Sequence, residues 1–159
     1  MVVVVMGVSG AGKTTVGMAL AAALGWPFVD GDDVHPSANV EKMRRGEPLD
    51  DADREPWLRA LAGWISTMRD GVVACSALKA SYRRLLRVRD DVRFVWLDLG
   101  RGELERRMRE RRGHFMPAAL LGAQIATMEE PTAEEDVVRV DGGKGVAELV
   151  GEVRRALRV

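Results

Sequence analysis

VVVVMGVSGAGKT, residues 2–14, sets the architecture of this chain. Its first part, Val2–Met6, is an unbroken apolar run rich in β-branched residues, which is typical of a strand buried on both faces of a parallel sheet. The remainder, Gly7–Thr14, matches the pattern G-x-x-x-x-G-K-[ST] at every position. Apolar residues at helical spacing then run from Lys13 to Leu24, and Gly25 predicts the end of that helix. A strand, a glycine-rich loop and a helix in this order predict a loop that binds the phosphates of a nucleotide.

The residue types in this loop explain how phosphate would be bound. Glycines allow successive backbone N–H groups to turn inward, and the helix N-terminus adds the positive end of its dipole. Lys13 can reach the β- and γ-phosphates of ATP, and the hydroxyl of Thr14 can bind Mg²⁺. The alternative, a glycine-rich turn without a ligand, is disfavoured because both flanks also fit. The expected ATP-binding residues are Gly7, Val8, Ser9, Gly10, Ala11, Gly12, Lys13, Thr14 and Thr15.

Two aspartates, Asp30 and Asp32, follow a second short apolar strand, Phe28–Val29. Residues i and i+2 of an extended backbone point the same way, so both carboxylates are expected to face the γ-phosphate position. One can hold Mg²⁺, and the other can accept the proton of an attacking hydroxyl. The alternatives are a solvated acidic turn or a cap for the next helix. Asp98 is a rival magnesium ligand, ranked lower because its strand, Val92–Leu97, is expected near the far edge of the sheet.

The composition limits the class of protein. A chain of 159 residues is expected to form one domain, residues 1–159. Lys+Arg and Asp+Glu balance at 24 each, which argues against non-specific binding to nucleic acid or to an anionic membrane. One cysteine excludes an intrachain disulfide and disfavours a cysteine-based zinc site. The first apolar run is too short to span a bilayer and lacks the basic start of a signal peptide, so a cytoplasmic location is expected.

Apolar runs alternate with helical patterns along the rest of the chain. Five short strands separated by helices predict an α/β fold, with a parallel sheet covered on both faces. Two charged segments, about 33–54 and about 106–131, are expected to be mobile at the ends of strands, where open α/β sheets bind ligands. The only asparagine, Asn39, is followed by Val40, so the N-K-x-D motif of guanine-specific switch proteins is absent. The best class is a small phosphotransferase.

The core is expected to include aromatic side chains of one long helix. Asp51 or Asp53 is expected to cap that helix, and its amphipathic stripe is expected to bury Trp57 and Trp64. Cys75 is expected to be a small buried apolar side chain and not a nucleophile.

Several pieces of the sequence resemble the gluconate kinases, small relatives of shikimate kinase and the nucleoside monophosphate kinases. The phosphate loop is common to many ATPases, whereas HP-x-x-N-x-x-K-M, G-E-P-L, C-S-A-L-K and G-H-F are more specific to this family. The likeness extends almost from end to end. Its pieces are MGVSGAGKT (6–14), DGDDVHP (30–36), EKMRRGEPLDDADREPWL (41–58), CSALKASYRRLLR (75–87), RRGHFM (111–116) and a METP-like segment at 128–131.

The resemblance implies phosphorylation of D-gluconate at its 6-hydroxyl by ATP and Mg²⁺, giving 6-phospho-D-gluconate for the pentose phosphate or Entner–Doudoroff route. It also implies a three-layer α/β/α P-loop fold, a five-stranded parallel sheet of order 2-3-1-4-5, a small helical lid and a homodimer. By the same resemblance, Asp32 is the partner of the substrate hydroxyl and the catalytic base, and Asp30 is on the magnesium side. Two alternatives stay open: a kinase for shikimate or another hydroxy acid, and a regulatory module that binds a nucleotide without transferring phosphate.

Five polar side chains are candidates for contact with a sugar acid. Ser76 and Lys79 follow the third strand, at the same sheet edge as the phosphate loop, and Arg83 lies one helical turn beyond Lys79. Lys42 and Arg54 lie in the charged segment 33–54. Any of the four cations can pair with a carboxylate, and bidentate geometry slightly favours Arg54 or Arg83. Lys79 can also be an ordinary surface residue at the start of a helix.

Histidines and a basic cluster complete the candidate site. His35 and His114 lie in family-specific motifs and are expected either to contact substrate hydroxyls or to be structural. The arginines of 106–112 can form a solvated helix face, but they border a glycine break typical of a lid. Arg111 is expected to neutralise charge on the transferred phosphoryl group, and Arg107 to lie near the adenine.

Overall fold

The computed structural model describes residues 1–110 and 118–159. Five parallel strands form one sheet in the order β2-β3-β1-β4-β5. The order predicted through the family resemblance is therefore confirmed. The strands are β1 (Val2–Met6), β2 (Phe28–Asp30), β3 (Gly71–Ala74), β4 (Val92–Asp98) and β5 (Val137–Asp141).

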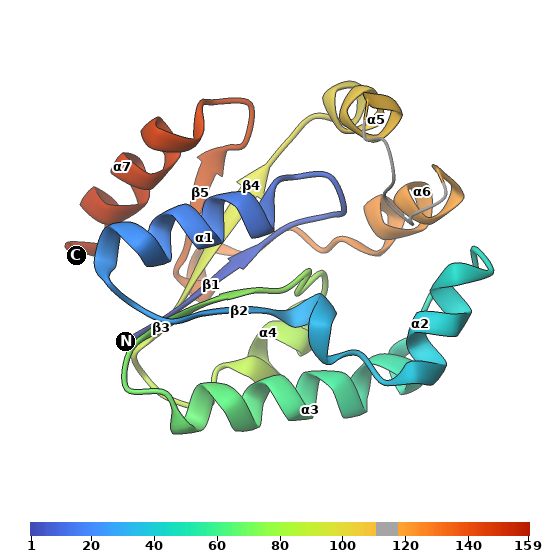
Figure 1. The fold of residues 1–159 in the computed structure, drawn as a ribbon, viewed down its shortest axis with the longest axis horizontal. Coiled ribbons are helices and arrows are strands. Elements are labelled where there is room, and N and C mark those ends of the chain that lie inside the picture. The colour runs from blue at the N-terminus through green and yellow to red at the C-terminus, as the bar shows by residue number, and fades with distance from the viewer. Residues whose placement is uncertain (111–117) are drawn as a thin grey trace.

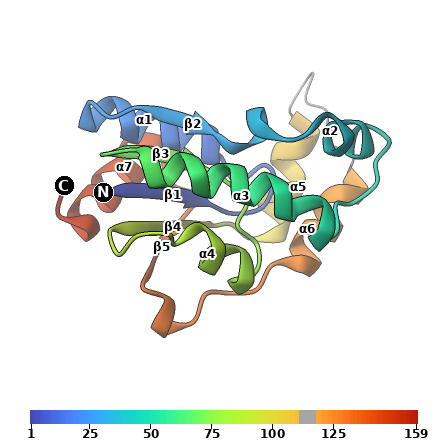
Figure 2. The ribbon, with the colours of Figure 1, turned by 90° about the horizontal axis from the view of Figure 1, so that it is seen from below.

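Helices cover both faces of the sheet and one of its ends. Figure 1 shows α1 and α7 on one face, α3 and α4 on the other, and α2, α5 and α6 beyond the ends of the strands. Figure 2 shows the same three helices at that end from a second direction. The predicted three-layer architecture is confirmed. The helices are α1 (Lys13–Leu24), α2 (Ser37–Arg44), α3 (Asp51–Thr67), α4 (Ala80–Leu86), α5 (Arg101–Glu110), α6 (Ala118–Thr127) and α7 (Val146–Leu157), with short 3₁₀ turns η1 (Gly31–Val34) and η2 (Ala133–Glu135).

The central strand β1 anchors the core. It pairs with β3 on one side and β4 on the other, and all five of its side chains, Val2–Met6, are fully buried. Burial of a valine side chain stabilises the fold by about 1.5 kcal/mol or more, so β1 fixes the sheet strongly. Because the phosphate loop follows β1 directly, it lies at the centre of the carboxyl edge of the sheet.

Two expectations about α3 are wrong. The side chain of Trp57 is buried, but Trp64 is 51% exposed, because the buried face of the helix is centred on Leu58, Leu61 and Ile65. The N-cap is Asp50, not Asp51 or Asp53. The carboxylate of Asp50 accepts from the N–H of Asp53 at 2.8 Å, and the carboxylate of Asp53 accepts from the N–H of Asp50 at 2.9 Å, which forms a capping box.

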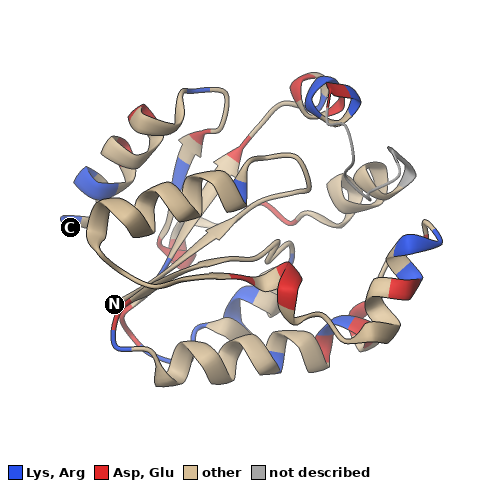
Figure 3. Ribbon diagram, in the orientation of Figure 1, with Lys and Arg blue, Asp and Glu red and all other residues tan. Residues whose placement is uncertain are grey.

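Charged side chains gather near the end of the sheet where the strands finish. Figure 3 shows acidic and basic residues crowding α5 and the segment formed by α2 and the start of α3. Cys75 is buried just after β3, as expected, and burial raises the pKa of its thiol to about 12. None of the helices in the described part of the chain has the length and apolar character needed to cross a membrane.

Candidate active site

Positive backbone φ angles shape the loop between β1 and α1. Gly12 has φ 94° at the N-cap of α1, and Gly7 has φ 145°. A Cβ atom on Gly7 would lie 3.1 Å from the carbonyl oxygen of Leu97, so the loop needs glycine there for space as well as for conformation. The side chains of Val8 and Ala11 are buried, which leaves their backbone groups to face a ligand, whereas Thr15 is exposed in the first turn of α1.

The phosphate loop has partners within the protein. The Nζ of Lys13 donates to the carbonyl oxygen of Val8 at 3.2 Å. The N–H of Ser9 donates to Oε1 of Gln124 on α6 at 2.8 Å. Sequence reasoning missed Gln124, although it is the only polar side chain between Ala118 and Ala126 and so stands out in an apolar helix.

A hydroxyl and a carboxylate meet behind the loop. Oγ1 of Thr14 donates to Oδ2 of Asp30 at 2.6 Å, which joins the start of α1 to the end of β2. Oxygen ligands of this kind suit Mg²⁺, which usually binds one or two protein groups together with substrate phosphates and water. No set of three or more acidic, histidine or cysteine side chains in the described ranges is placed to hold a metal alone. Thr14 and Asp30 therefore fit a magnesium ion that a nucleotide would help to bind.

Asp32 reaches the site by a route that differs from the predicted one. The backbone leaves the extended conformation at Asp30, because its Oδ1 accepts from the N–H of Asp32 at 3.0 Å and caps η1. The expectation of two carboxylates aligned by an extended strand is wrong. A tight turn brings them together instead, and Gly31 permits it, since a Cβ there would lie 2.6 Å from the carbonyl oxygen of Ala74.

A cavity of about 240 Å³ opens beside the phosphate loop. Its walls come from the loop, η1, α2, α3, α5 and α6, so it joins segments far apart in the sequence. Met108 of α5 and Gln124 of α6 line it although the sequence pointed to neither. The predicted site residues that line this cavity are Ser9, Gly10, Gly12, Lys13, Thr14, Asp32, His35, Arg54 and Ser76.

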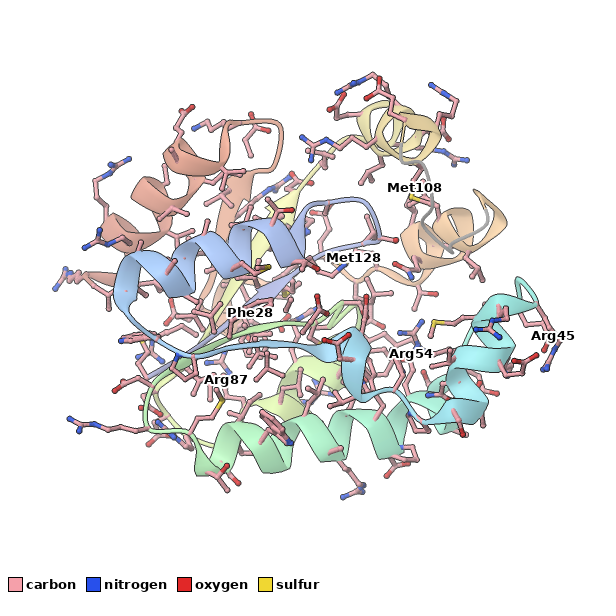
Figure 4. The ribbon with its side chains drawn as sticks, viewed as in Figure 1. Phe28, Arg45, Arg54, Arg87, Met108 and Met128 are labelled. Carbon is pink, nitrogen blue, oxygen red and sulfur yellow. The ribbon has the colours of Figure 1, made fainter. Side chains whose placement is uncertain are left out.

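Arg54 is the most unusual charge in this cavity. Its side chain belongs to a residue only 6% exposed, and its Nε donates to the carbonyl oxygen of Leu49 at 3.3 Å. Within the described part of the chain, no carboxylate lies within 4.0 Å of this guanidinium. Figure 4 shows Arg54 on α3 and Met108 on α5, on opposite sides of the space next to the loop. A buried guanidinium without an acidic partner is costly unless an anionic ligand pairs with it.

The other predicted cations have acidic partners and do not line the cavity. Nζ of Lys42 lies 2.5 Å from Oδ2 of Asp53, and Nζ of Lys79 lies 2.7 Å from Oδ1 of Asp51. Tyr82 also donates to that oxygen of Asp51.

Arg83 is almost fully buried away from the cavity. Its Nε and Nη2 donate to the carboxylate of Glu135 at 2.5 and 2.8 Å, and its Nη1 donates to three carbonyl oxygens, those of Ala77, Leu78 and Glu129. These bonds hold the pKa of Glu135 below its usual range. The donors of Arg83 are thus used to join α4 to the segment after α6.

His35 contributes a buried imidazole to the cavity. Only 4% of its side chain is exposed, and burial lowers the pKa of the ring to about 4, so it is neutral near pH 7. The positive charge of Arg54 lowers this pKa further, while Asp32 raises it.

Arg107 lies on the other side of the phosphate loop. Its Nη1 donates to the carbonyl oxygen of Ala11 at 3.4 Å, and its Nη2 donates to that of Gly142 at 2.9 Å. Arg111 and His114 lie outside the described residues.

Asp98 is held by a neighbouring strand. Contrary to the expectation, β4 lies next to the central strand β1 and not at the sheet edge. Nη2 of Arg139 on β5 is 2.5 Å from Oδ2 of Asp98, so this carboxylate already has a cationic partner, unlike Asp30.

Comparison with known proteins extends these observations. A family profile described as shikimate kinase matches residues 9–144. A gluconokinase of Gluconobacter oxydans (strain 621H) is 53% identical over 146 residues, which cover 89% of this chain and 82% of that protein. The thermosensitive gluconokinase of Escherichia coli (strain K12) is 43% identical over 97% of this chain and 86% of that protein. The crystal structure of a gluconokinase from Sinorhizobium meliloti 1021 has a TM-score of 0.91 at 46% identity, covering 98% of this chain and 90% of that one.

The fold, the phosphate loop and the adjoining cavity define a small kinase of the P-loop class. Shikimate kinase from Aquifex aeolicus, with a TM-score of 0.70 at 17% identity, shares this fold. Identity of 43–53% over most of the chain is more specific, and the chain belongs to the gluconokinase family.

Proposed function

We propose that this protein transfers the γ-phosphoryl group of ATP to the 6-hydroxyl of D-gluconate, giving 6-phospho-D-gluconate and ADP. The observation that carries the proposal is a buried arginine without an acidic partner, Arg54, in the cavity that adjoins the phosphate loop. Such a cavity suits a small molecule with a carboxylate at one end and a hydroxyl to be phosphorylated at the other. The gluconokinases named above support the same substrate.

Arg54 is the proposed partner of the substrate carboxylate. A guanidinium can donate two parallel hydrogen bonds to a carboxylate, and burial strengthens them. Lys42, Lys79 and Arg83 have acidic partners of their own, which favours Arg54 among the four predicted cations. With the carboxylate at Arg54, the polyol chain would extend across the cavity toward Asp32 and Ser76.

Asp32 is the proposed partner of the 6-hydroxyl. Its side chain is 67% exposed and lines the cavity together with Lys13, so it can accept the hydroxyl proton as the oxygen attacks phosphorus. The loop amides and Lys13 would stabilise charge on the phosphoryl oxygens, with Lys13 exchanging the carbonyl of Val8 for phosphate.

Thr14 and Asp30 are the proposed holders of Mg²⁺, since their oxygens already meet at 2.6 Å. When bound, the ion supplies charge neutralisation on the phosphates. Arg107 is the proposed adenine neighbour, because it spans the loop at Ala11 and the turn at Gly142.

Several features stay predictions from the sequence. They are the phosphoryl contact of Arg111, the substrate contact of His114, and the roles of segment 33–54 in substrate binding and of segment 106–131 as a lid. A homodimer and a cytoplasmic location rest on the family resemblance and the sequence composition. Size-exclusion chromatography with light scattering tests the dimer.

The test of the proposed function is ADP release coupled to a reporter reaction, measured over a panel of sugar acids and shikimate. Stimulation by gluconate, with 6-phosphogluconate identified by NMR, is the expected result. Asp32→Asn should lower kcat by roughly a thousandfold, and Lys13→Ala should cost transfer far more than folding. Turnover with shikimate but not gluconate would refute the substrate, and nucleotide binding without any transfer would refute the reaction.

A further inference from the structure

We propose that Asn39 and His35 are positioning residues for the carboxylate of Asp32: Asn39 fixes the imidazole in the Nε2–H tautomer, and that N–H orients the carboxylate. This rests on the proposed function, in which Asp32 accepts the hydroxyl proton. The three side chains lie on η1 and the first turn of α2, and the ring of His35 lies between the other two.

The amide of Asn39 has only one possible orientation. Its Nδ2 lies 2.8 Å from the backbone carbonyl oxygen of Asp53, which can only accept a hydrogen bond. The same nitrogen lies 3.4 Å from Nδ1 of His35, and Asn39 is only 4% exposed. An NH₂ group has two hydrogens, so it donates to both partners. Nδ1 is therefore an acceptor, and because the ring is neutral near pH 7, its single proton is on Nε2.

One indole holds both the ring and the turn that carries Asp32. The rings of His35 and Trp57 are stacked, with centroids 4.1 Å apart and planes 16° apart. Nε1 of Trp57 donates to the carbonyl oxygen of Gly31 at 2.7 Å, at the first residue of η1. The imidazole is thus fixed in position relative to the backbone of Asp32.

The donor is rigid and the acceptor is free to turn. The side chain of His35 is 4% exposed, whereas that of Asp32 is 67% exposed, and Nε2 of the first lies 4.0 Å from Oδ1 of the second. A small rotation of Asp32 closes this gap to a hydrogen bond. The N–H would then hold Oδ1 and leave Oδ2 to face the substrate hydroxyl, which lowers the number of orientations that Asp32 must lose before transfer.

The decisive experiment compares variants at positions 35 and 39. In Asn39→Asp a carboxylate replaces the donor, accepts from Nδ1–H and reverses the tautomer, so kcat should fall roughly tenfold or more while KM for gluconate stays within about threefold. His35→Gln keeps an amide donor near the Nε2 position and should retain kcat within about threefold, whereas His35→Asn, which reaches only the Nδ1 position, should lose as much as Asn39→Asp.

A double variant separates positioning from a merely structural role. In the His35→Gln background there is no tautomer to reverse, so Asn39→Asp should change kcat by less than about threefold. An equal loss in both backgrounds would show that Asn39 acts through Asp53 and the fold, and would overturn the proposal.

Imidazole ¹⁵N spectra give a readout that needs no activity. The chain has 2 histidines, and the signals lost in His35→Gln identify those of His35. Protonation of Nε2 in the wild type is expected, and protonation of Nδ1 would overturn the proposal even if Asn39→Asp failed to fold. Failure of the proposed function shows differently: Asp32→Asn would then keep its activity, whatever tautomer His35 adopts.

Discussion

Replacement of Arg54 by methionine removes the proposed partner of the substrate carboxylate and should weaken catalysis without weakening the fold. Loss of one member of a buried, hydrogen-bonded charge pair costs about 2–5 kcal/mol. Arg54 is 6% exposed, but the cavity that it lines is open on one side, so we take about 3 kcal/mol, which corresponds to a fall of roughly 150-fold in kcat/KM for gluconate. Most of the loss should be in KM, because the carboxylate is remote from the reacting hydroxyl.

The stability of the same variant should hardly change. Methionine replaces a buried charge that has no carboxylate within 4.0 Å in the described part of the chain, and only the bond from Nε to Leu49 is lost. The free energy of unfolding, measured with urea, should therefore change by less than about 1 kcal/mol. A large loss of stability would show that Arg54 is structural.

A neutral substrate and a second cation provide the controls. D-glucitol has the same hydroxyl chain but no carboxylate, so Arg54→Met should not lower its turnover further. Lys79→Met breaks an ion pair with Asp51 outside the cavity and should change KM for gluconate by less than about threefold. A large effect of Lys79→Met together with a small effect of Arg54→Met would refute the assignment.

Three further predictions follow from the same contacts. Arg83→Met should lower the free energy of unfolding by about 3–5 kcal/mol, because it leaves Glu135 and three carbonyl oxygens without their donor; a loss below about 1 kcal/mol in urea titration would contradict this. Because the pKa of His35 is about 4 in the folded protein and 6.5 in an exposed imidazole, the unfolded chain binds its proton first as the pH falls. Stability should decline from pH 6.5 to pH 4 by about 3 kcal/mol, and His35→Gln should remove that part of the decline in urea titrations. Gln124→Leu removes the acceptor of the Ser9 amide, whose hydrogen exchange should quicken roughly fivefold; unchanged exchange would show that the 2.8 Å bond does not protect it.

The fold could be predicted from the sequence because its signals are local. A strand buried on both faces needs an unbroken apolar run, and Gly7 and Gly12 have backbone angles that other residues adopt with difficulty. The strand order was predicted through the family resemblance, since alternation of strands and helices gives a parallel sheet but not the order of its strands.

The partners of the cations could not be predicted, because they depend on contacts between distant segments. Helical spacing relates Lys79 to Arg83, but the acid that faces Lys79 is 28 positions away and the acid that faces Arg83 is 52 positions away. The same limit applies to Trp64, since the face of α3 that becomes buried is decided by the sheet against which it packs. Arg54 stands out only when the partners of the other cations are known.

The most direct measurement is a crystal structure of the protein with gluconate and a non-hydrolysable ATP analogue. The expected result has the gluconate carboxylate on Arg54, and the 6-hydroxyl within hydrogen-bond distance of Asp32 and in line with the γ-phosphorus. A sugar acid bound in the reverse direction, or a 6-hydroxyl distant from Asp32, would contradict the proposed mechanism.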